Sequence, residues 1–210
     1  MLAKLTGWLL LGVVRLLTGA QARWYGCPPK AEQRIYFANH QSHADLVMIW
    51  AALPEELRTI TRPIAARDYW ANTPFKRWIT TEVFNAVYVE RAAPPAAEGE
   101  PPGPDPLAPL IEALKSGDSI IIFPEGTRGF ATEPQKFKSG LFSLATLFPD
   151  VVLVPAWIEN IQRVMPKGEV VPVPILCSVT FGAPVQLAPG EERRPFLDRA
   201  RDAVIALRSV

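Results

Sequence analysis

The chain has 210 residues, of which 49% are hydrophobic, and its 22 basic and 21 acidic side chains leave a formal net charge of +1. A chain of this length can bury a sizeable core, so intrinsic disorder is excluded as a description of the whole. The near-neutral balance argues against a nucleic-acid-binding protein, which would normally be strongly basic. Two cysteines, Cys27 and Cys177, are too few for a disulfide framework and form no CxxC pair, which favours a reducing compartment.

Residues 1–24 predict an amphipathic helix that anchors the protein to a membrane. Residues 1–30 contain four basic side chains and no acidic one, and apolar side chains dominate the first half of this segment. On a helix, Lys4 and Arg15 point within about 20° of each other, as in a helix that lies at a membrane interface with its charged edge toward the headgroups. The apolar run is too short to span a bilayer. A signal peptide ending near Ala20-Gln21-Ala22 and a core helix of a soluble protein are the alternatives.

After this segment, alternating strands and helices predict an α/β fold. Short runs of β-branched and aromatic residues predict strands at 33–38, 83–89, 119–123, 151–157 and 174–181. Apolar residues at helical spacing predict helices at 44–53, 107–116, 138–147 and 195–208. We therefore expect residues 25–210 to form one α/β domain, with a mixed, largely parallel sheet flanked by helices.

Two segments between these elements have an unusual composition. Residues 92–112 carry four acidic side chains and no basic one, and seven of the 22 prolines fall between positions 94 and 109. A Pro-rich loop at 92–109, inserted within the domain, is the expected structure. Residues 58–78 instead mix five basic side chains with four aromatic ones, which suits an anionic membrane surface or, equally, a solvated helical face.

Both histidines of the chain lie in one short segment, between the predicted strand at 33–38 and the helix that follows it. If the chemistry near neutral pH needs an imidazole base, His40 or His43 must supply it. Asp45, in the first helical turn, can reach back to His40 and fix its tautomer, whereas His43 and Asp45 do not face each other on a helix. We therefore predict that His40 is the base and that Asp45 orients it.

Other interpretations of this segment stay open. Ser42-x-x-Asp45 also matches a capping box, in which both side chains only satisfy amides at the start of a helix. A metal site is disfavoured because no third histidine or ligating cysteine completes the set. Ser42 as a covalent nucleophile would lack the usual Gly-x-Ser-x-Gly turn.

A second polar cluster, Pro124-Glu125-Gly126-Thr127-Arg128-Gly129, follows the predicted strand at 119–123. Glycines beside a carboxylate and a guanidinium predict a tight loop whose amides and Arg128 could grip a phosphate, although an ordinary polar turn would look the same. Arg91 ends another predicted strand, and Lys136 and Lys138 follow the loop. Cations that converge on one site imply an anionic ligand.

Together these segments resemble the motif blocks of the glycerolipid acyltransferases, most of all the bacterial 1-acylglycerol-3-phosphate acyltransferases. The blocks, in order, are Asn39-His40-x4-Asp45, Val89-Glu90-Arg91, Phe123-Pro124-Glu125-Gly126-Thr127-Arg128 and Val154-Pro155-Ala156-Trp157. The chain departs from the pattern at Asn85, where many members carry glycine. This departure concerns the acceptor side of the site more than the catalytic side.

The resemblance implies transfer of a fatty acyl group from a thioester of coenzyme A or acyl carrier protein to the free hydroxyl of a lysophospholipid such as lysophosphatidate. It implies no metal, no other cofactor and no acyl-enzyme. His40 would be the general base, Asp45 its orienting partner, and the acceptor's phosphate would be held by Arg91, Glu125, Gly126, Thr127, Arg128 and Lys138. The enzyme would work at the cytoplasmic face of a membrane, as a peripheral or monotopic protein. A non-catalytic lipid-binding protein and a thioesterase-like hydrolase are the competing classes.

Overall fold

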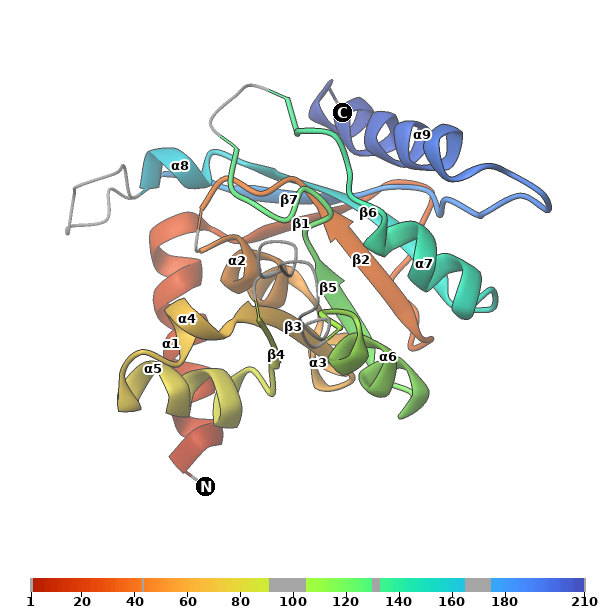
Figure 1. The fold of residues 1–210 in the computed structure, drawn as a ribbon. Helices are drawn as coiled ribbons and strands as arrows, with labels where there is room; N and C mark the ends of the chain where they lie inside the picture. Colours follow the sequence, from red (N-terminus) through yellow and green to blue (C-terminus); the bar gives the residue numbers. More distant parts are fainter. Residues whose placement is uncertain (1, 43, 91–104, 130–132, 165–174, 210) are drawn as a thin grey trace.

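The computed structural model describes residues 2–42, 44–90, 105–129, 133–164 and 175–209, which form one seven-stranded sheet with helices on both faces (Figure 1). The strands are β1 (Gln21–Trp24), β2 (Arg34–Ala38), β3 (Thr61–Ala66), β4 (Val87–Val89), β5 (Ser119–Ile122), β6 (Val152–Glu159) and β7 (Ser178–Phe181). Their order across the sheet is β1-β7-β6-β2-β5-β3-β4. Neighbouring strands are parallel except β6 and β7, so the predicted mixed, largely parallel sheet is confirmed.

Each face of the sheet has its own layer of helices. One face is covered by α1 (Leu2–Thr18), α2 (Asp45–Ala52), α3 (Glu55–Thr59), α4 (Arg67–Trp70) and the π-helical turn η1 (Ile79–Val83), which continues directly from α5 (Pro74–Trp78). The other face is covered by α6 (Ala108–Lys115), α7 (Gly140–Leu147) and α9 (Arg193–Ala206), which ends in the 3-10 turn η2 (Leu207–Ser209). The short helix α8 (Ile161–Val164) follows β6.

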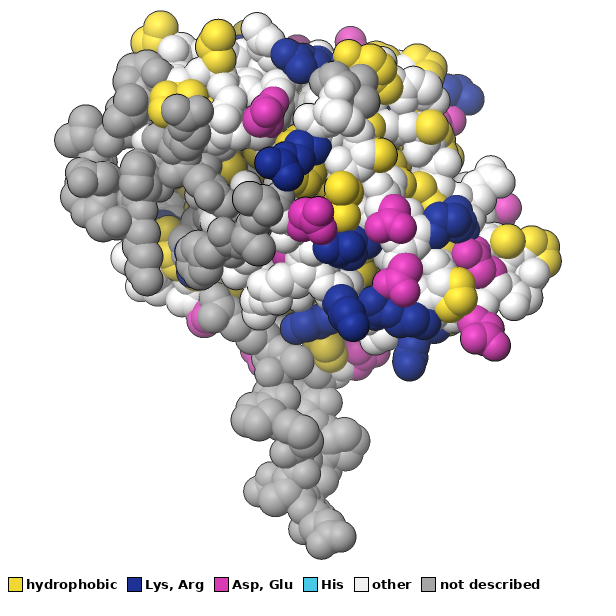
Figure 2. Space-filling view, turned by 90° about the horizontal axis from the view of Figure 1, so that it is seen from above, with side chains coloured by type: hydrophobic (Ala, Val, Ile, Leu, Met, Phe, Trp, Pro, Cys, Tyr) yellow, Lys and Arg dark blue, Asp and Glu magenta, His cyan; other side chains and the backbone are white. Residues whose placement is uncertain are grey.

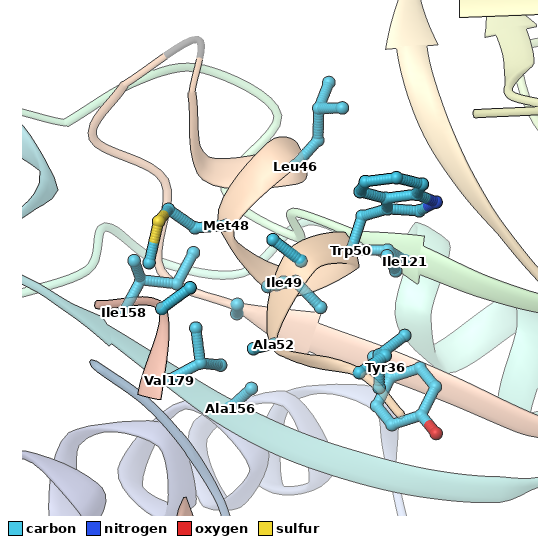
Figure 3. Close-up of a cluster of buried hydrophobic side chains, with 14 of the residues drawn as sticks. Tyr36, Leu46, Met48, Ile49, Trp50, Ala52, Ile121, Ala156, Ile158 and Val179 are labelled. Carbon is cyan, nitrogen blue, oxygen red and sulfur yellow. The ribbon is translucent and has the colours of Figure 1, made fainter. Parts of the chain in front are cut away.

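Side chains of the central strand β2 alternate between the two cores. Tyr36 and Ala38 belong to the core on the α2 side, whereas Ile35 and Phe37 belong to the core under α7 and α9. All four are fully buried, as expected of a parallel strand covered on both faces. Figure 3 shows the first core, where side chains of α2 meet those of β2, β5, β6 and β7. These two cores hold the end of β2 in a fixed position.

Most predicted elements are present, with small shifts at their ends. The strand predicted at 83–89 is correct only for Val87–Val89, because the chain before it forms η1 and packs Val83 and Phe84 against the first core. Strand β3 was not predicted. It lies within the segment 58–78, and its six residues alternate between buried and half-buried positions.

The N-terminal helix α1 ends at Thr18, although the sequence predicted a helix over residues 1–24. Gly19 and Ala20 both have positive φ angles, 69° and 37°, which end a right-handed helix. Gln21–Trp24 then form β1 at the edge of the sheet, beside β7. Neither α1 nor any other helix in the described part of the chain has the length and apolar character needed to cross a bilayer.

The predicted Pro-rich loop at 92–109 lies mostly outside the described residues. Where the description resumes, the Asp105 carboxylate accepts the Leu107 N–H at 2.9 Å. Helix α6 starts immediately afterwards, so Ala108 and Pro109 are helical.

Candidate active site

The His40 segment and the loop containing Pro124–Arg128 lie at the same edge of the sheet. They follow β2 and β5, which are parallel neighbours and therefore leave the sheet in the same direction. The two segments also contact each other directly. The His40 N–H donates to Oε1 of Glu125 at 2.7 Å, and the Gly129 N–H donates to the His40 C=O at 2.8 Å. The structure thus brings the two predicted polar clusters together.

His40 Nδ1 lies 2.8 Å from Oδ2 of Asp45. The Asp45 side chain is completely buried, and the same oxygen accepts the N–H groups of Gln41 at 2.6 Å and Ser42 at 2.8 Å. With a carboxylate at Nδ1, the favoured neutral tautomer of His40 carries its proton there and leaves Nε2 as an acceptor. The imidazole is 20% exposed. An imidazole that is oriented by a buried carboxylate and still partly exposed is the arrangement that a general base requires.

The capping interpretation of Ser42-x-x-Asp45 describes part of the same geometry. Asp45 accepts the Ser42 N–H, and Ser42 Oγ accepts the Ala44 N–H at 3.2 Å. Because the capping carboxylate is also the partner of His40, capping fixes its position and does not exclude a catalytic role. His43 lies outside the described residues. Within those residues, no cluster of three or more His, Cys, Asp or Glu side chains could hold a metal ion.

Two residues for which the sequence predicted no role, Asn39 and Phe123, hold His40 in place. The Asn39 amide donates to the Ile158 C=O at 3.0 Å and accepts the Ile158 N–H at 2.8 Å, which ties the end of β2 to β6. Phe123 stacks on the imidazole, with ring centroids 4.4 Å and ring planes 17° apart. Both residues belong to the motif blocks, but nothing in the sequence revealed these contacts.

Glu125 is a buried carboxylate, 2% exposed, that joins two loops. Its Oε1 accepts the His40 N–H, and its Oε2 accepts the Gln135 N–H at 2.7 Å. Burial raises the pKa of this carboxyl above its ordinary value, and the two backbone hydrogen bonds partly offset the shift. Because both oxygens are engaged by the backbone, any contribution of Glu125 to phosphate binding would act through the shape of the loop.

The other predicted phosphate ligands of this loop, Gly126, Thr127, Arg128 and Lys138, are exposed. Gly126 has a φ of 68°, and a Cβ atom here would lie 2.7 Å from Lys138 Nζ, so glycine allows the lysine side chain to cross the loop. None of the ion pairs between described residues involves Arg128 or Lys138. Both cations are therefore available to an anion. Arg91 lies outside the described residues.

Asn85, the departure from the motif pattern, has a φ of 48°. This left-handed region favours glycine and admits asparagine more readily than most other residues. The Asn85 C=O accepts the Nε–H of Arg62 at 2.9 Å. Asparagine at this position therefore keeps a backbone conformation that suits glycine.

A family model for acyltransferases matches residues 27–159, which contain both the His40 segment and the Pro124–Arg128 loop. The chain belongs to the acyltransferase family. The family indicated by the motif blocks is thereby confirmed, and the match contains β2 to β6 with the helices between them.

Two relatives extend this comparison. The acyltransferase chain is 27% identical over 147 residues to the Arabidopsis thaliana protein named 1-acyl-sn-glycerol-3-phosphate acyltransferase LPAT1, chloroplastic, a match that covers 67% of this chain and 36% of LPAT1. It thus spans about a third of the length of that curated relative. Its fold is similar to the crystal structure of PlsC, the 1-acyl-sn-glycerophosphate acyltransferase of Thermotoga maritima, with a TM-score of 0.69, 22% identity, and coverage of 99% of this chain and 80% of PlsC.

Proposed function

We propose that this acyltransferase transfers a fatty acyl group from an acyl thioester to the free hydroxyl of lysophosphatidate, giving phosphatidate in phospholipid biosynthesis. The observation that carries the proposal is the His40–Asp45 pair, fixed by backbone hydrogen bonds beside a loop with exposed Arg128 and Lys138. The names of both relatives, which are 1-acylglycerol-3-phosphate acyltransferases, support this choice of acceptor. The donor is a thioester of coenzyme A or acyl carrier protein.

In the proposed mechanism, His40 Nε2 takes the proton of the acceptor hydroxyl while that oxygen attacks the thioester carbonyl. Asp45 keeps the imidazole oriented and stabilises the imidazolium that forms. The tetrahedral intermediate then expels the thiolate, which takes the proton from His40 and leaves as a thiol. A positioned base of this kind accelerates a reaction by about 10²–10⁴-fold. Acyl transfer in this scheme is direct and forms no bond between the acyl group and the protein.

The acceptor's phosphate is assigned to the exposed loop next to His40. Arg128 and Lys138 supply two cations, and Arg91 is expected to supply a third. Gly126 and Thr127 form the turn between the buried Glu125 and Arg128. A phosphate held in this way places the acceptor hydroxyl beside the base and turns a bimolecular encounter into a local one.

We propose further that α1 attaches the enzyme to the cytoplasmic face of a membrane, as a peripheral or monotopic protein. One side of α1 carries an apolar stripe whose side chains are 52–84% exposed: Leu2, Leu5, Trp8, Leu9, Val13 and Leu16. The helix has no acidic residue, and its two basic residues, Lys4 and Arg15, are exposed. An exposed apolar stripe next to basic side chains suits a helix that lies on anionic lipid.

The C-terminal end of α1 lies at the sheet edge that carries His40. Gln21, at the start of β1, pairs with Ser178 of β7, and Ser178 pairs with Glu159 at the C-terminal end of β6. Since β6 runs parallel to β2, all of these positions lie near the end of β2. Exposed Leu176 extends the apolar surface at this end. Attachment through α1 would therefore hold the site close to the lipids that contain its acceptor.

The activity is tested by incubating purified protein with acyl-coenzyme A or acyl carrier protein thioester and a panel of lysolipids, and identifying the products by mass. We expect phosphatidate from lysophosphatidate.

His40→Ala should lower kcat by about 10²–10⁴-fold without unfolding the protein. Arg128→Ala should chiefly raise the acceptor KM. Lys115→Ala, at an exposed lysine on the helix that leads into the opposite end of β5, is the matched control.

Two results would contradict this proposal. Thioester cleavage that is independent of any lysolipid would indicate a hydrolase. Lysolipid binding without turnover by the wild-type protein would indicate a lipid-binding protein that does not catalyse the reaction.

A further inference from the structure

Arg201, on α9, contacts residues 133 and 134, which precede the Gln135 N–H that binds Glu125. Helix α9 lies beyond the residues matched by the family model. Its Nε–H donates to the Pro134 C=O at 2.8 Å, and its Nη2 donates to the Glu133 carboxylate at 3.1 Å. The Arg201 side chain is only 24% exposed. These bonds connect the C-terminal helix to the segment that leads back into α7.

The other arginines of α9 that form ion pairs bind acidic residues of the helix itself or of the residues just before it. Helix α9 lies at the top of Figure 1, and Figure 2 shows basic and acidic side chains gathered side by side on that face. Arg194 pairs with Asp198 within the helix, and Arg199 pairs with Glu191 just before it. Arg201 instead bonds across to residues 133 and 134.

Residues 133–135 lead directly to the catalytic pair. Gln135 follows Pro134, and its N–H donates to Oε2 of Glu125 at 2.7 Å. Oε1 of Glu125 accepts the His40 N–H at the same distance. Arg201 is thus connected to the His40 backbone through one short segment and one buried carboxylate. We call this connection the Arg201 brace.

We propose that Arg201 is a positioning residue for acyl transfer, which holds residues 133–135 so that Gln135 and His40 share the carboxylate of Glu125. The effect on rate rests on the function proposed above. A buried carboxylate that loses one of its two donors is left undersatisfied, which favours its rotation or protonation. Either change weakens the hydrogen bond that fixes His40.

Two features of the contact between Arg201 and residues 133–134 suit it to holding Gln135 in place. It is planar and donates from Nε and Nη2 at once, so it fixes a carbonyl and a carboxylate in one geometry, which a lysine ammonium cannot reproduce. The Pro134 C=O and the Gln135 N–H belong to one planar peptide group, so a hydrogen bond that fixes this carbonyl also fixes the direction of the N–H that binds Glu125. Among the described residues, the polar partners of Arg201 are Glu133, Pro134 and Asp202, not Arg128 or Lys138, so its loss should lower kcat and leave the acceptor KM unchanged.

The kinetic test compares Arg201→Ala and Arg201→Lys with Arg199→Ala, a control on the same helix whose arginine bonds to Glu191 and the Gln186 C=O. We expect Arg201→Ala to lower kcat about 10- to 100-fold at constant acceptor KM, because small misplacements of reacting groups have effects of this size. Arg201→Lys should be intermediate, and Arg199→Ala should resemble the wild type. Equal kcat values for Arg201→Ala and Arg199→Ala would overturn the proposal.

A double-mutant cycle with Glu125→Gln tests whether the two residues act through one connection. A glutamine cannot accept two N–H bonds with two oxygens, so Glu125→Gln already breaks the brace. Adding Arg201→Ala should then lower kcat no further. Losses in kcat that multiply fully would show that the residues act independently and would contradict the brace.

Amide hydrogen exchange provides a readout that does not need activity. In folded Arg201→Ala and Arg201→Lys, the N–H groups of His40 and Gln135 should exchange faster than in the wild type, and Arg199→Ala should leave both rates unchanged. Unchanged exchange at His40 in a folded Arg201 variant would refute the brace. If the wild type acylated no lysolipid, the proposed function would fail while this experiment still decided the inference.

Discussion

Asp45 and Glu125, the two buried carboxylates of the site, are both held by backbone N–H groups. Asp45 accepts two N–H groups from the turn before α2, and Glu125 accepts one from each of two loops. Backbone donors cannot be moved by changing a side chain rotamer, so both carboxylates are placed accurately by the fold itself. The consequence for His40 is that its ring and its main chain are fixed by different carboxylates.

A guanidinium is buried at the opposite end of β2, where Arg34 is 1% exposed. Its guanidinium donates to Glu32 at 2.7 Å and to the Pro28 C=O at 2.9 Å. The hydrogen bond from Arg34, with a second from Lys30, lowers the pKa of Glu32 below its ordinary value of 4.5. A carboxyl with a lowered folded-state pKa stabilises the fold above its unfolded-state pKa and loses this effect as the pH falls through the folded-state value.

We therefore predict that Glu32→Gln lowers the free energy of unfolding by about 1–3 kcal/mol at neutral pH. The difference from the wild type should shrink as the pH falls from 4.5 through the lower folded-state pKa, below which the wild-type carboxyl is protonated in both states. Urea unfolding over a series of pH values measures it. Glu112→Gln, which removes only an exposed pair with Lys115, is the control and should change stability by less than about 1 kcal/mol. A difference that did not change with pH would contradict this account.

At the scale of elements, α1 and α9 present opposite kinds of surface. The exposed side of α9 carries ion pairs, whereas the exposed side of α1 carries the apolar stripe. A contiguous exposed apolar surface is rare on soluble proteins unless it meets a partner or a membrane. The buried side of α1 packs against α2 and η1, so the helix is fixed to the domain while its stripe remains free.

We predict that the double substitution Leu9→Glu with Leu16→Glu lowers partitioning onto anionic vesicles at least about 10-fold. Burial of one leucine side chain contributes about 1.5–3 kcal/mol, so the loss of two is a large effect. The side chains are 62% and 84% exposed, and Tm should therefore hardly change. Vesicle co-sedimentation measures the binding, with Leu147→Glu, an exposed leucine on α7, as control. An equal loss in the Leu147 variant would mean that the stripe has no special role.

The elements that the sequence predicted are those with a strong apolar pattern, such as β2 and α9. Strand β1 was missed because it is a four-residue edge strand with three exposed side chains, so backbone pairing defines it and no apolar pattern does. Strand β3 was missed because Arg62 and Pro63 interrupt its short apolar run.

At the site, too, features carried by side chains were predicted and features carried by the backbone or by distant segments were not. The sequence singled out His40, Asp45 and the Pro124–Arg128 loop because their side chains are of reactive or charged types, and the structure brings them together. The contacts of Gln135 and Arg201 could not be predicted, because one acts through a backbone N–H and the other comes from a distant helix. Local sequence does not record which N–H or which helix will lie beside a loop in the folded chain.

At the scale of the whole molecule, the sheet topology determines which loops and helix ends lie at the same end of the molecule. Five neighbouring strands, β6, β2, β5, β3 and β4, run in one direction, and β7 and β1 run in the other. The C-terminal ends of β2 and β5 and the N-terminal start of β1 therefore lie along the same side of the sheet, where these strands end or begin. This places His40 and Asp45, the Pro124–Arg128 loop and the C-terminal end of α1 at the same end of the molecule (Figure 1).

If α1 serves attachment alone, the stripe variant with Leu9→Glu and Leu16→Glu should separate binding from chemistry. Against long-chain lysophosphatidate in vesicles, its kcat/KM should fall about as much as vesicle binding does. Against a short-chain lysophosphatidate that stays monomeric in solution, with a soluble donor, kcat/KM should remain within about twofold of the wild type, because the sheet edge and the loop are unchanged. His40→Ala should lower kcat by about 10²–10⁴-fold in both assays. Loss of activity on the soluble acceptor would instead place α1 within the acceptor site, and full activity on vesicles would show that attachment through α1 is not needed.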